Sequence, residues 1–388
     1  MVYRMTEWIE CTLDKLGEIV GGATPSTKCE DYYGGSIPWI TPKDLSSFKG
    51  RYITSGERNI TEKGLASCSA QMMPKDAVLF TSRAPIGYVA IASQSVCTNQ
   101  GFKSIVVNEK ADPLFVYYLL KYNKDAIEAM GSGTTFKEVS GKTMRAVKVR
   151  IPLDVSYQNR IAAVLDSLDT KIENNERIND NLHQQAATLF KALFVDLTPF
   201  DGTMPPNWTI STLGDATEMG AGGDKPKESS PVKTPLCPYP IYSNGINDYG
   251  LYGYTNDPKI KVESVTVSAR GTIGYVCLRH TPYVPIVRLV TLIPDTKVLS
   301  AKYLYLYLRQ LHITGTGTTQ QQLTVPDFRK TEIIIPDKNT MDSFTETVTP
   351  LFEQIWANED ENTKLAEVRD ALLPKLMSGE IDVSDIQL

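Results

Sequence analysis

Residues 157–194 read YQNRIAAVLDSLDTKIENNERINDNLHQQAATLFKALF, and most of the expected architecture follows from this pattern. One stripe of residues recurs in it at alternating steps of four and three, the heptad spacing of a helix that packs lengthwise against another helix. At 1.5 Å per residue the stretch predicts one helix about 57 Å long. The stripe consists of Ile161, Leu165, Leu168, Ile172, Asn175, Asn179, Leu182, Ala186, Leu189 and Leu193.

The same steps recur near the end of the chain, so the sequence predicts a second long helix. Its stripe consists of Phe344, Val348, Leu351, Ile355, Asn358, Asn362, Leu365, Arg369, Leu372 and Leu376. Proline lacks the backbone N–H of an inner helical residue, so we expect Pro350 to kink this helix or mark its start. For the same reason we expect Pro374 to disturb its last turns.

Both stripes carry two asparagines at the same two mid-helix positions. A lone helix with such a stripe is unstable in water, so each needs a partner, and the other helix is the nearest one. If the two run antiparallel, both asparagine pairs meet at the middle. We therefore expect a cluster at a pseudo-two-fold axis, formed by Asn175, Asn179, Asn358 and Asn362. The alternative is that these amides face solvent or a separate protein.

The segments outside the helices also recur in order, which predicts a tandem duplication with a period near 185–200 residues. Five motifs match between the two copies. The pairs are Trp8–Thr12–Leu13 with Trp208–Thr212–Leu213, Ile37-Pro38 with Tyr239-Pro240, 83–89 (RAPIGYV) with 270–276 (RGTIGYV), 131–135 (GSGTT) with 315–319 (GTGTT), and 149–152 (VRIP) with 333–336 (IIIP).

Short apolar runs between turn residues predict strands in each copy, with one helix near 113–130 and one near 301–311. The predicted class is therefore α+β, with two similar β-rich globular domains separated by two long antiparallel helices in a duplicated, pseudo-two-fold arrangement. The expected boundaries are 1–155 for the first domain, 156–198 for the central helix, 199–340 for the second domain and 341–388 for the C-terminal helix.

Charge is distributed unevenly along the chain. Residues 1–156 carry a net +3 and residues 201–340 a net +2, whereas residues 157–200 carry −2 and residues 341–388 carry −8. The domains are thus mildly basic and the helices acidic. A basic domain surface permits contact with phosphate, although ordinary solvated surface charge is the alternative.

Several classes of protein are excluded or disfavoured by composition. No run of about 18 apolar residues is present, and the N-terminus has no apolar core stretch, so we expect neither a membrane span nor a signal peptide. Six scattered cysteines without a C-x-x-C pair argue against zinc and disulfides and fit a reducing cytoplasm. We find no phosphate-binding, dinucleotide-binding, metalloprotease or hydrolase motif, so we expect no catalytic residue, metal or cofactor on this chain.

Candidate DNA contacts come from the repeated motifs. Gly/Thr loops let a backbone approach a ligand closely, and hydroxyls suit phosphate oxygens. Glutamine can pair bidentately with adenine, and lysine can reach phosphate or guanine. The alternatives are a tight connection for the loops and surface ion pairs for the arginines. The candidate set is Lys43, Arg83, Thr134, Thr135, Lys137, Arg270, Thr318, Thr319, Gln320 and Gln321.

The helices carry a specific family resemblance. Residues 158–172 (QNRIAAVLDSLDTKI), with Asn174-Asn175 and Leu189-Phe190 beyond them, resemble the central conserved region of type I restriction–modification specificity subunits. Residues 372–381 (LLPKLMSGEI) resemble the C-terminal conserved region of that family. The segment 8–17 and the loop 131–135 resemble the start and end of its target-recognition domains. The resemblance covers the whole chain.

The resemblance implies a subunit that binds a bipartite double-stranded DNA site. Each recognition domain would read one half, and the helices would set the spacer and dock two modification subunits that methylate adenine N6. In some systems two restriction subunits join these. We expect half-sites about one duplex turn apart, ~34 Å. The alternatives are a bipartite DNA-binding protein or a coiled-coil scaffold without methyltransferase partners, or an enzyme with an unrecognised site.

Overall fold

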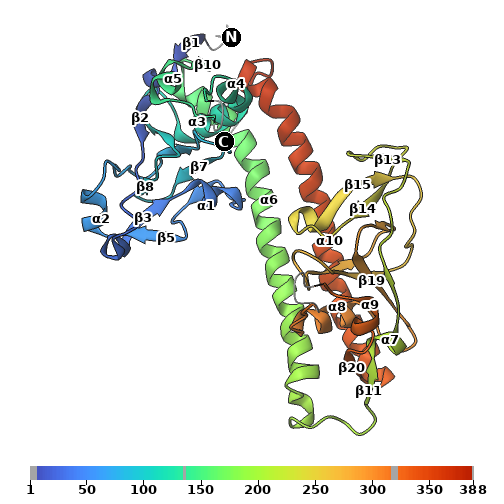
Figure 1. The fold of residues 1–388 in the computed structure, drawn as a ribbon. Coiled ribbons are helices and arrows are strands. Elements are labelled where there is room, and N and C mark those ends of the chain that lie inside the picture. The colour runs from blue at the N-terminus through green and yellow to red at the C-terminus, as the bar shows by residue number, and fades with distance from the viewer. Residues whose placement is uncertain (1–6, 134–136, 316–321, 387–388) are drawn as a thin grey trace. The chain divides into compact units, whose positions relative to one another are not determined.

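The computed structural model describes residues 7–133, 137–315 and 322–386. The chain divides into two units: unit 1 comprises residues 1–175 and 359–388, and unit 2 comprises residues 176–358. Each unit holds one β-rich domain and sections of the two long helices, α6 (Val155–Phe190) and α10 (Lys338–Ser378) (Figure 1). The predicted α+β class with an internal duplication is confirmed.

The domain of unit 1 is built on a five-stranded sheet with the order β2-β9-β6-β7-β4. A three-stranded sheet (β5-β3-β8) and a two-stranded sheet (β1-β10) complete it. The strands are β1 (Trp8–Thr12), β2 (Gly17–Gly21), β3 (Tyr33–Ile40), β4 (Tyr52–Ile53), β5 (Arg58–Ile60), β6 (Val78–Phe80), β7 (Val89–Ala92), β8 (Cys97–Thr98), β9 (Lys103–Val107) and β10 (Lys148–Pro152). The helices are η1 (Leu13–Lys15), η2 (Glu30–Tyr32), α1 (Pro42–Ser46), α2 (Glu62–Ala66), α3 (Pro113–Tyr122), α4 (Lys124–Ala129) and α5 (Gly141–Ala146).

The domain of unit 2 repeats this plan with two four-stranded sheets, β12-β19-β16-β17 and β13-β15-β14-β18, and the two-stranded sheet β11-β20. The strands are β11 (Thr209–Thr212), β12 (Thr217–Ala221), β13 (Ser229–Ser230), β14 (Tyr239–Tyr242), β15 (Leu251–Thr255), β16 (Ser264–Ser268), β17 (Val276–Arg279), β18 (Val284–Pro285), β19 (Leu289–Pro294) and β20 (Glu332–Ile335). The short helices are η3 (Lys191–Val195, a π-helical turn), η4 (Thr198–Phe200), α7 (Leu213–Ala216), η5 (Asn247–Gly250), α8 (Ala301–Gln310) and α9 (Val325–Phe328).

One apolar helix covers the main sheet in each domain. In unit 1, α3 packs on β6 and β7, and in unit 2, α8 packs on β16, β17 and β19. Each helix begins at a side-chain N-cap: Asp112 accepts from the Phe115 N–H at 2.8 Å, and Ser300 accepts from the Tyr303 N–H at 3.2 Å. These caps satisfy N–H groups that the first helical turn leaves without a partner. The corresponding helices of the two domains thus begin with the same kind of cap.

The repeated motifs at the two ends of each domain meet in one small sheet. Trp8 lies opposite Pro152 in the β1-β10 pair, and Thr209, next to Trp208, lies opposite Ile335 in β11-β20. Trp208 is buried, and its indole N–H donates to Asp337 Oδ2 at 3.1 Å. Each domain therefore closes on itself just where a long helix begins.

The long helices run antiparallel within each unit. In unit 1 the first half of α6 pairs with the second half of α10, and Ile161 and Leu376 share one core. In unit 2 the second half of α6 pairs with the first half of α10, and Phe190 packs against Phe344 with ring centroids 6.0 Å apart.

The structure corrects one position of the predicted stripe and decides one alternative for Pro350. Leu189 is 37% exposed, and the neighbouring Phe190 and Phe194 are buried instead. An α-helix of 3.6 residues per turn drifts relative to a 3.5-residue stripe, and the π-helical turn adds to this shift. Pro350 does not mark the start of α10, which begins at Lys338. Buried side chains on both sides of Pro350, among them Val348 and Phe352, hold the helix through it.

Candidate nucleic-acid interface

The hairpin that carries Arg83 is a preorganised turn between β6 and β7. The Thr81 hydroxyl donates to the Pro85 carbonyl and accepts from the Tyr88 N–H, both at 2.9 Å. Gly87 has a φ of +94°, a conformation that glycine adopts without cost. The Arg83 side chain, 45% exposed, stands at the tip of this turn.

Arg83 forms an ion pair with Glu138 at the end of the Gly/Thr loop of unit 1. We call this contact, and the corresponding contact of Arg270 in unit 2, the arginine latch. The Arg83 Nε lies 2.9 Å from Glu138 Oε2. The base of the loop is closed by two backbone hydrogen bonds between Ser132 and Glu138, and Val139 N–H donates to Ser82 O at 2.8 Å. The predicted contacts Thr134 and Thr135 lie outside the described residues, whereas Lys137 is described and exposed.

Sequence reasoning missed two further cations beside this latch. Lys103, on β9, lies 3.8 Å from Glu138 Oε1, and burial lowers the pKa of its ammonium group. A Cβ added to Gly141 would lie 3.7 Å from both Arg145 Nη1 and Lys103 Cε, so these two side chains converge. Arg83 and Lys103 thus share the carboxylate of Glu138, and Arg145 lies beside Lys103 at Gly141, so cations outnumber the carboxylate in this part of the domain.

Unit 2 repeats the latch with an uncharged partner. Arg270 follows β16, and its Nε and Nη2 donate to Gln322 Oε1 at 3.0 and 2.6 Å. Leu323 N–H donates to Ala269 O at 3.0 Å, as Val139 does to Ser82 in unit 1. Because Gln322 is neutral, this partner does not compensate the charge of the Arg270 guanidinium, whereas Glu138 compensates that of Arg83. The predicted contacts Thr318, Thr319, Gln320 and Gln321 lie outside the described residues.

A second arginine that the sequence analysis missed stands close to Arg270. Asn244 joins two loops: its Oδ1 accepts from Ala269 N–H at 3.1 Å and its Nδ2 donates to Val287 O at 2.8 Å. Val287 and Arg288 are both exposed and have φ values of 28° and 63°. Such left-handed conformations cost about 1–3 kcal/mol in non-glycine residues and persist where surrounding contacts impose them. This loop therefore holds Arg288 out beside the latch.

The Gly-Gly turns of the two copies serve backbone packing. A Cβ on Gly22 would lie 2.2 Å from the Thr98 carbonyl, and one on Gly222 would lie 2.9 Å from the Ile286 carbonyl. Only glycine lets the two segments approach so closely. In unit 1 the neighbouring Thr24 and Gln100 side chains are hydrogen-bonded to each other. The two turns are thus part of the scaffold that supports the arginine loops.

Lys43 belongs to a different part of the first domain. It lies on α1, whose N-terminus has a capping box formed by Thr41 and Asp44. Its Nζ contacts Glu57 Oε2 at 2.6 Å, and its side chain is 78% exposed. An exposed pair of this kind contributes little to stability and exchanges readily with another anion.

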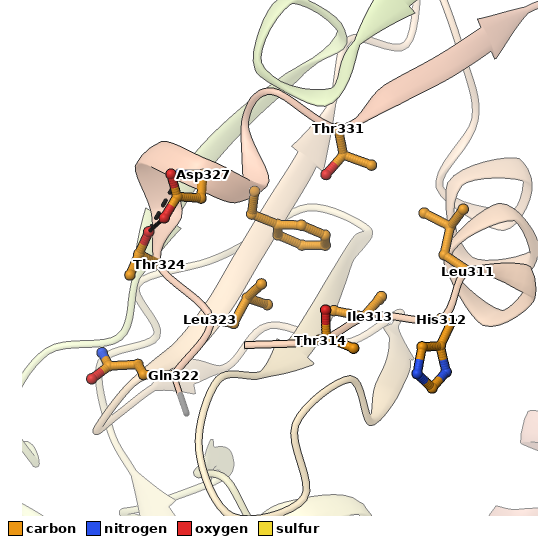
Figure 2. Close-up of a pocket in the computed structure, with 10 residues that line it drawn as sticks. Leu311, His312, Ile313, Thr314, Gln322, Leu323, Thr324, Asp327 and Thr331 are labelled. Carbon is orange, nitrogen blue, oxygen red and sulfur yellow. Dashed lines mark hydrogen bonds between the residues drawn. The ribbon is translucent and has the colours of Figure 1, made fainter. Parts of the chain in front are cut away.

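A pocket of about 240 Å³ opens beside Gln322 in unit 2. Figure 2 shows Gln322 and His312 at opposite sides of it, and Thr324 caps α9 by bonding Asp327. Its lining consists of residues 311–314, 322–324, Asp327, Phe328 and Thr331. The pocket adjoins Gln322, the partner of Arg270. We call the surface around each arginine latch the rim of its domain: Arg270, Gln322, Arg288 and this pocket in unit 2, and Arg83, Lys103, Lys137, Glu138 and Arg145 in unit 1.

The seam asparagines bond across the helix pair in both units. In unit 1, Asn175 Nδ2 donates to Asn362 Oδ1 at 2.8 Å and to Glu361 Oε2 at 2.7 Å. In unit 2, Asn358 Nδ2 donates to Asn179 Oδ1 at 2.7 Å, and Asn179 Nδ2 donates to Ile355 O at 3.2 Å. Bonded amides in an apolar seam fix the register of the helices, since any slip leaves them without partners.

Other chemistry finds little support in the described residues. No three His, Cys, Asp or Glu side chains there are grouped so as to hold a metal ion. All six cysteines are free thiols. Among the described helices, none combines the length and the apolar character needed to cross a membrane.

Comparison with known proteins identifies the family. The family model "Type I restriction modification DNA specificity domain" matches residues 5–184 and 205–367, one match for each copy. The MjaIX specificity subunit of Methanocaldococcus jannaschii is 34% identical over 98% of this chain and 95% of its own length. The HindI specificity subunit of Haemophilus influenzae is 25% identical over 72% of this chain and 80% of its own.

A solved structure supports the fold. The type I restriction–modification S subunit from M. genitalium superposes with a TM-score of 0.62 at 16% identity, covering 97% of each chain. With the family match on both copies and a 34% identical relative along nearly its full length, the chain belongs to the family of type I restriction–modification specificity subunits.

Proposed function

We propose that this chain reads a bipartite double-stranded DNA site, one half with each domain. The observation that carries the proposal is the arginine latch, which recurs in both domains with the same backbone contacts and a different partner residue. Equivalent frames with different side chains suit two half-sites of different sequence. Phosphate contacts fix the position of a domain on the duplex, and neighbouring side chains distinguish the bases.

We assign phosphate contact first to the cations that lie around the two arginine loops. These are Arg83, Lys103, Lys137 and Arg145 in the first domain and Arg270 and Arg288 in the second. Lys43 and the Gly/Thr-loop residues Thr134, Thr135, Thr318, Thr319, Gln320 and Gln321 remain predicted contacts on the same reasoning. The acidic helices would be repelled by phosphate, so we place DNA on the domains.

The proposal assigns the remaining parts of a type I system to partner proteins. The paired helices set the spacer between half-sites and dock two modification subunits, which methylate adenine N6, and two restriction subunits join in systems that have them. This chain contributes no catalytic group of its own. The acid excess of residues 341–388 suits protein partners better than DNA.

A genome-wide map of N6-methyladenine tests the proposal. Cells that express the modification subunit from the same locus are compared with and without this chain. The proposal predicts a two-part, gapped motif methylated only when the chain is present. No chain-dependent motif, with the modification subunit shown to be present and active on another specificity subunit, would contradict the proposal and favour a DNA reader or scaffold without methyltransferase partners.

A further inference from the structure

Arg51 is a buried arginine that joins the first domain to its spacer helix. It lies between α1 and β4 and is only 5% exposed. Its Nη1 donates to the Asp166 carbonyl at 3.0 Å and also to the Asp166 carboxylate, and its Nη2 donates to Thr170 Oγ1 at 2.9 Å. Glu173 accepts from Nε and from Nη2, so all three nitrogens of the guanidinium donate to residues of α6.

Glu173 chelates Arg51 from the next turn of the helix. Its Oε1 accepts from Nε at 3.1 Å and from the Arg51 backbone N–H at 3.2 Å, and its Oε2 accepts from Nη2 at 3.1 Å. The three helix partners are spaced i, i+4 and i+7, so they form one face. A planar guanidinium held bidentately is fixed in orientation as well as in position.

A second polar contact in unit 1 extends the junction to the other helix. Tyr118 on α3 donates to Asp169 Oδ2 at 2.8 Å, and Arg369 Nη1 on α10 contacts Asp169 Oδ1 at 2.7 Å. Apolar packing around these groups is non-directional and tolerates small rotations. The polar network supplies the directional part of the contact between domain and helices.

The second domain meets its helices differently. Its own buried arginine, Arg279, bonds Thr266 Oγ1 at 3.0 Å and the Tyr249 carbonyl at 2.7 Å, so it stays within the domain. The described contacts from this domain to α10 include the stacked rings of His280 and Trp356, with centroids 4.1 Å apart. Neither these rings nor the hydroxyl hydrogen bond between Thr345 of α10 and Ser300 fixes a rotation as a chelated guanidinium does.

Arg51 is also coupled to the DNA-facing rim of its domain. Its carbonyl accepts from the Ile91 N–H of β7 at 2.7 Å, and β7 follows directly on the Arg83 hairpin. A change in how Arg51 sits on α6 therefore moves the strand that carries this hairpin. Neighbouring base pairs differ by about 34–36° of rotation along the duplex, so the rotation of a domain decides which spacer length it accepts.

We propose that Arg51 is a positioning residue that locks the rotation of the first domain on α6 and so restricts the complex to one spacer length. This inference rests on the proposed function. A buried ionic network roughly breaks even in stability against apolar residues of similar volume. The contribution of the network is therefore orientation more than stability.

The test uses the complete complex of this chain with its modification subunits. DNA substrates share the half-sites found by the methylation map and differ only in spacer length, by one base pair either way. Initial methylation rates are measured for the wild type, for R51M, and for R51M/D166N/E173Q, which removes the charges that R51M leaves without a partner. R279M is the matched control, since it removes a buried arginine whose partners lie within one domain.

We expect both Arg51 variants to lower the preference for the native spacer by about tenfold, which corresponds to about 1.4 kcal/mol. Half-site sequences should not change, and R279M should keep the native preference. An equal fall in rate on every spacer for both Arg51 variants would overturn the inference and show a merely structural role. A wild type that methylates no gapped site would instead overturn the proposed function itself.

Discussion

Exchanging the partners of Arg83 and Arg270 tests whether the charge of each partner sets how strongly the arginine contributes to DNA binding. Arg83 is paired with the carboxylate of Glu138 at 2.9 Å, whereas Arg270 is held by the neutral amide of Gln322. In E138Q the Arg83 guanidinium keeps a hydrogen-bond acceptor, and the carboxylate that compensates its charge is gone. In Q322E the Arg270 guanidinium gains a carboxylate partner that compensates its charge. The two variants should therefore change DNA affinity in opposite directions.

The size of the effect follows from counterion release. Each phosphate contact made by a cation contributes about 0.9 to the slope of log affinity against log salt. We expect E138Q to steepen the slope by about 0.9 and Q322E to flatten it by about 0.9. Between 50 and 200 mM salt each change amounts to about 3.5-fold in affinity. The half-exposed Arg83–Glu138 pair contributes about 0–1 kcal/mol to stability, so the fold should tolerate E138Q.

The assay is fluorescence anisotropy of a labelled duplex that carries the cognate site, titrated with the modification complex at four or more salt concentrations. The control is E10Q, which removes the same charge from the exposed Lys148–Glu10 pair on the β1-β10 sheet. The reasoning is refuted if E138Q changes the slope no more than E10Q does, or if Q322E leaves the slope at the wild-type value.

Three further outcomes follow from the structure. N179L should lower the free energy of unfolding in urea by about 1–3 kcal/mol, because it leaves the buried Asn358 amide without its acceptor. N179L/N358L should recover most of that loss. Additive losses in the double variant would contradict the hydrogen bond between the two amides. Burial lowers the pKa of His183, so the unfolded chain binds a proton at a higher pH than the folded chain does. The free energy of unfolding should therefore fall as the pH drops below about 6.5. H183N should weaken this dependence in urea titrations at several pH values. Inserting one heptad into α6 and one into α10 lengthens each helix by about 10.5 Å. The preferred spacer in the methylation map should then lengthen by about three base pairs, with unchanged half-sites. Altered half-sites would contradict the proposal that the helices set the spacer length.

The long helices were predictable because heptad spacing is local. The steps of four and three follow from the geometry of a single helix, and Ile161, Leu165 and Val348 are buried as the pattern requires. Which residues of the stripe are buried could be predicted less well towards the end of α6, where Leu189 is exposed. The turn that carries it is decided by aromatic packing around Phe190, which brings together residues from distant parts of the chain.

The rims were only partly predictable, because their function depends on pairs that are distant in sequence. Internal repetition pointed to Arg83 and Arg270. It carried no sign that Glu138 and Gln322, both seven residues after the first glycine of their loops, are the latch partners. Arg288 had no signal, since its position matches Gly101 in the first copy. Arg51 escaped notice because its partners lie more than 100 residues away on α6.

The most direct measurement of the central claim is a domain exchange read by methylation mapping. Residues 205–336, which lie between the two long helices, are replaced with the corresponding segment of the M. jannaschii relative, and the N6-methyladenine motif is compared with that of the unaltered chain. If each domain reads one half-site, one half of the motif changes while the other half stays the same. A motif in which both halves change, or neither does, would contradict the account.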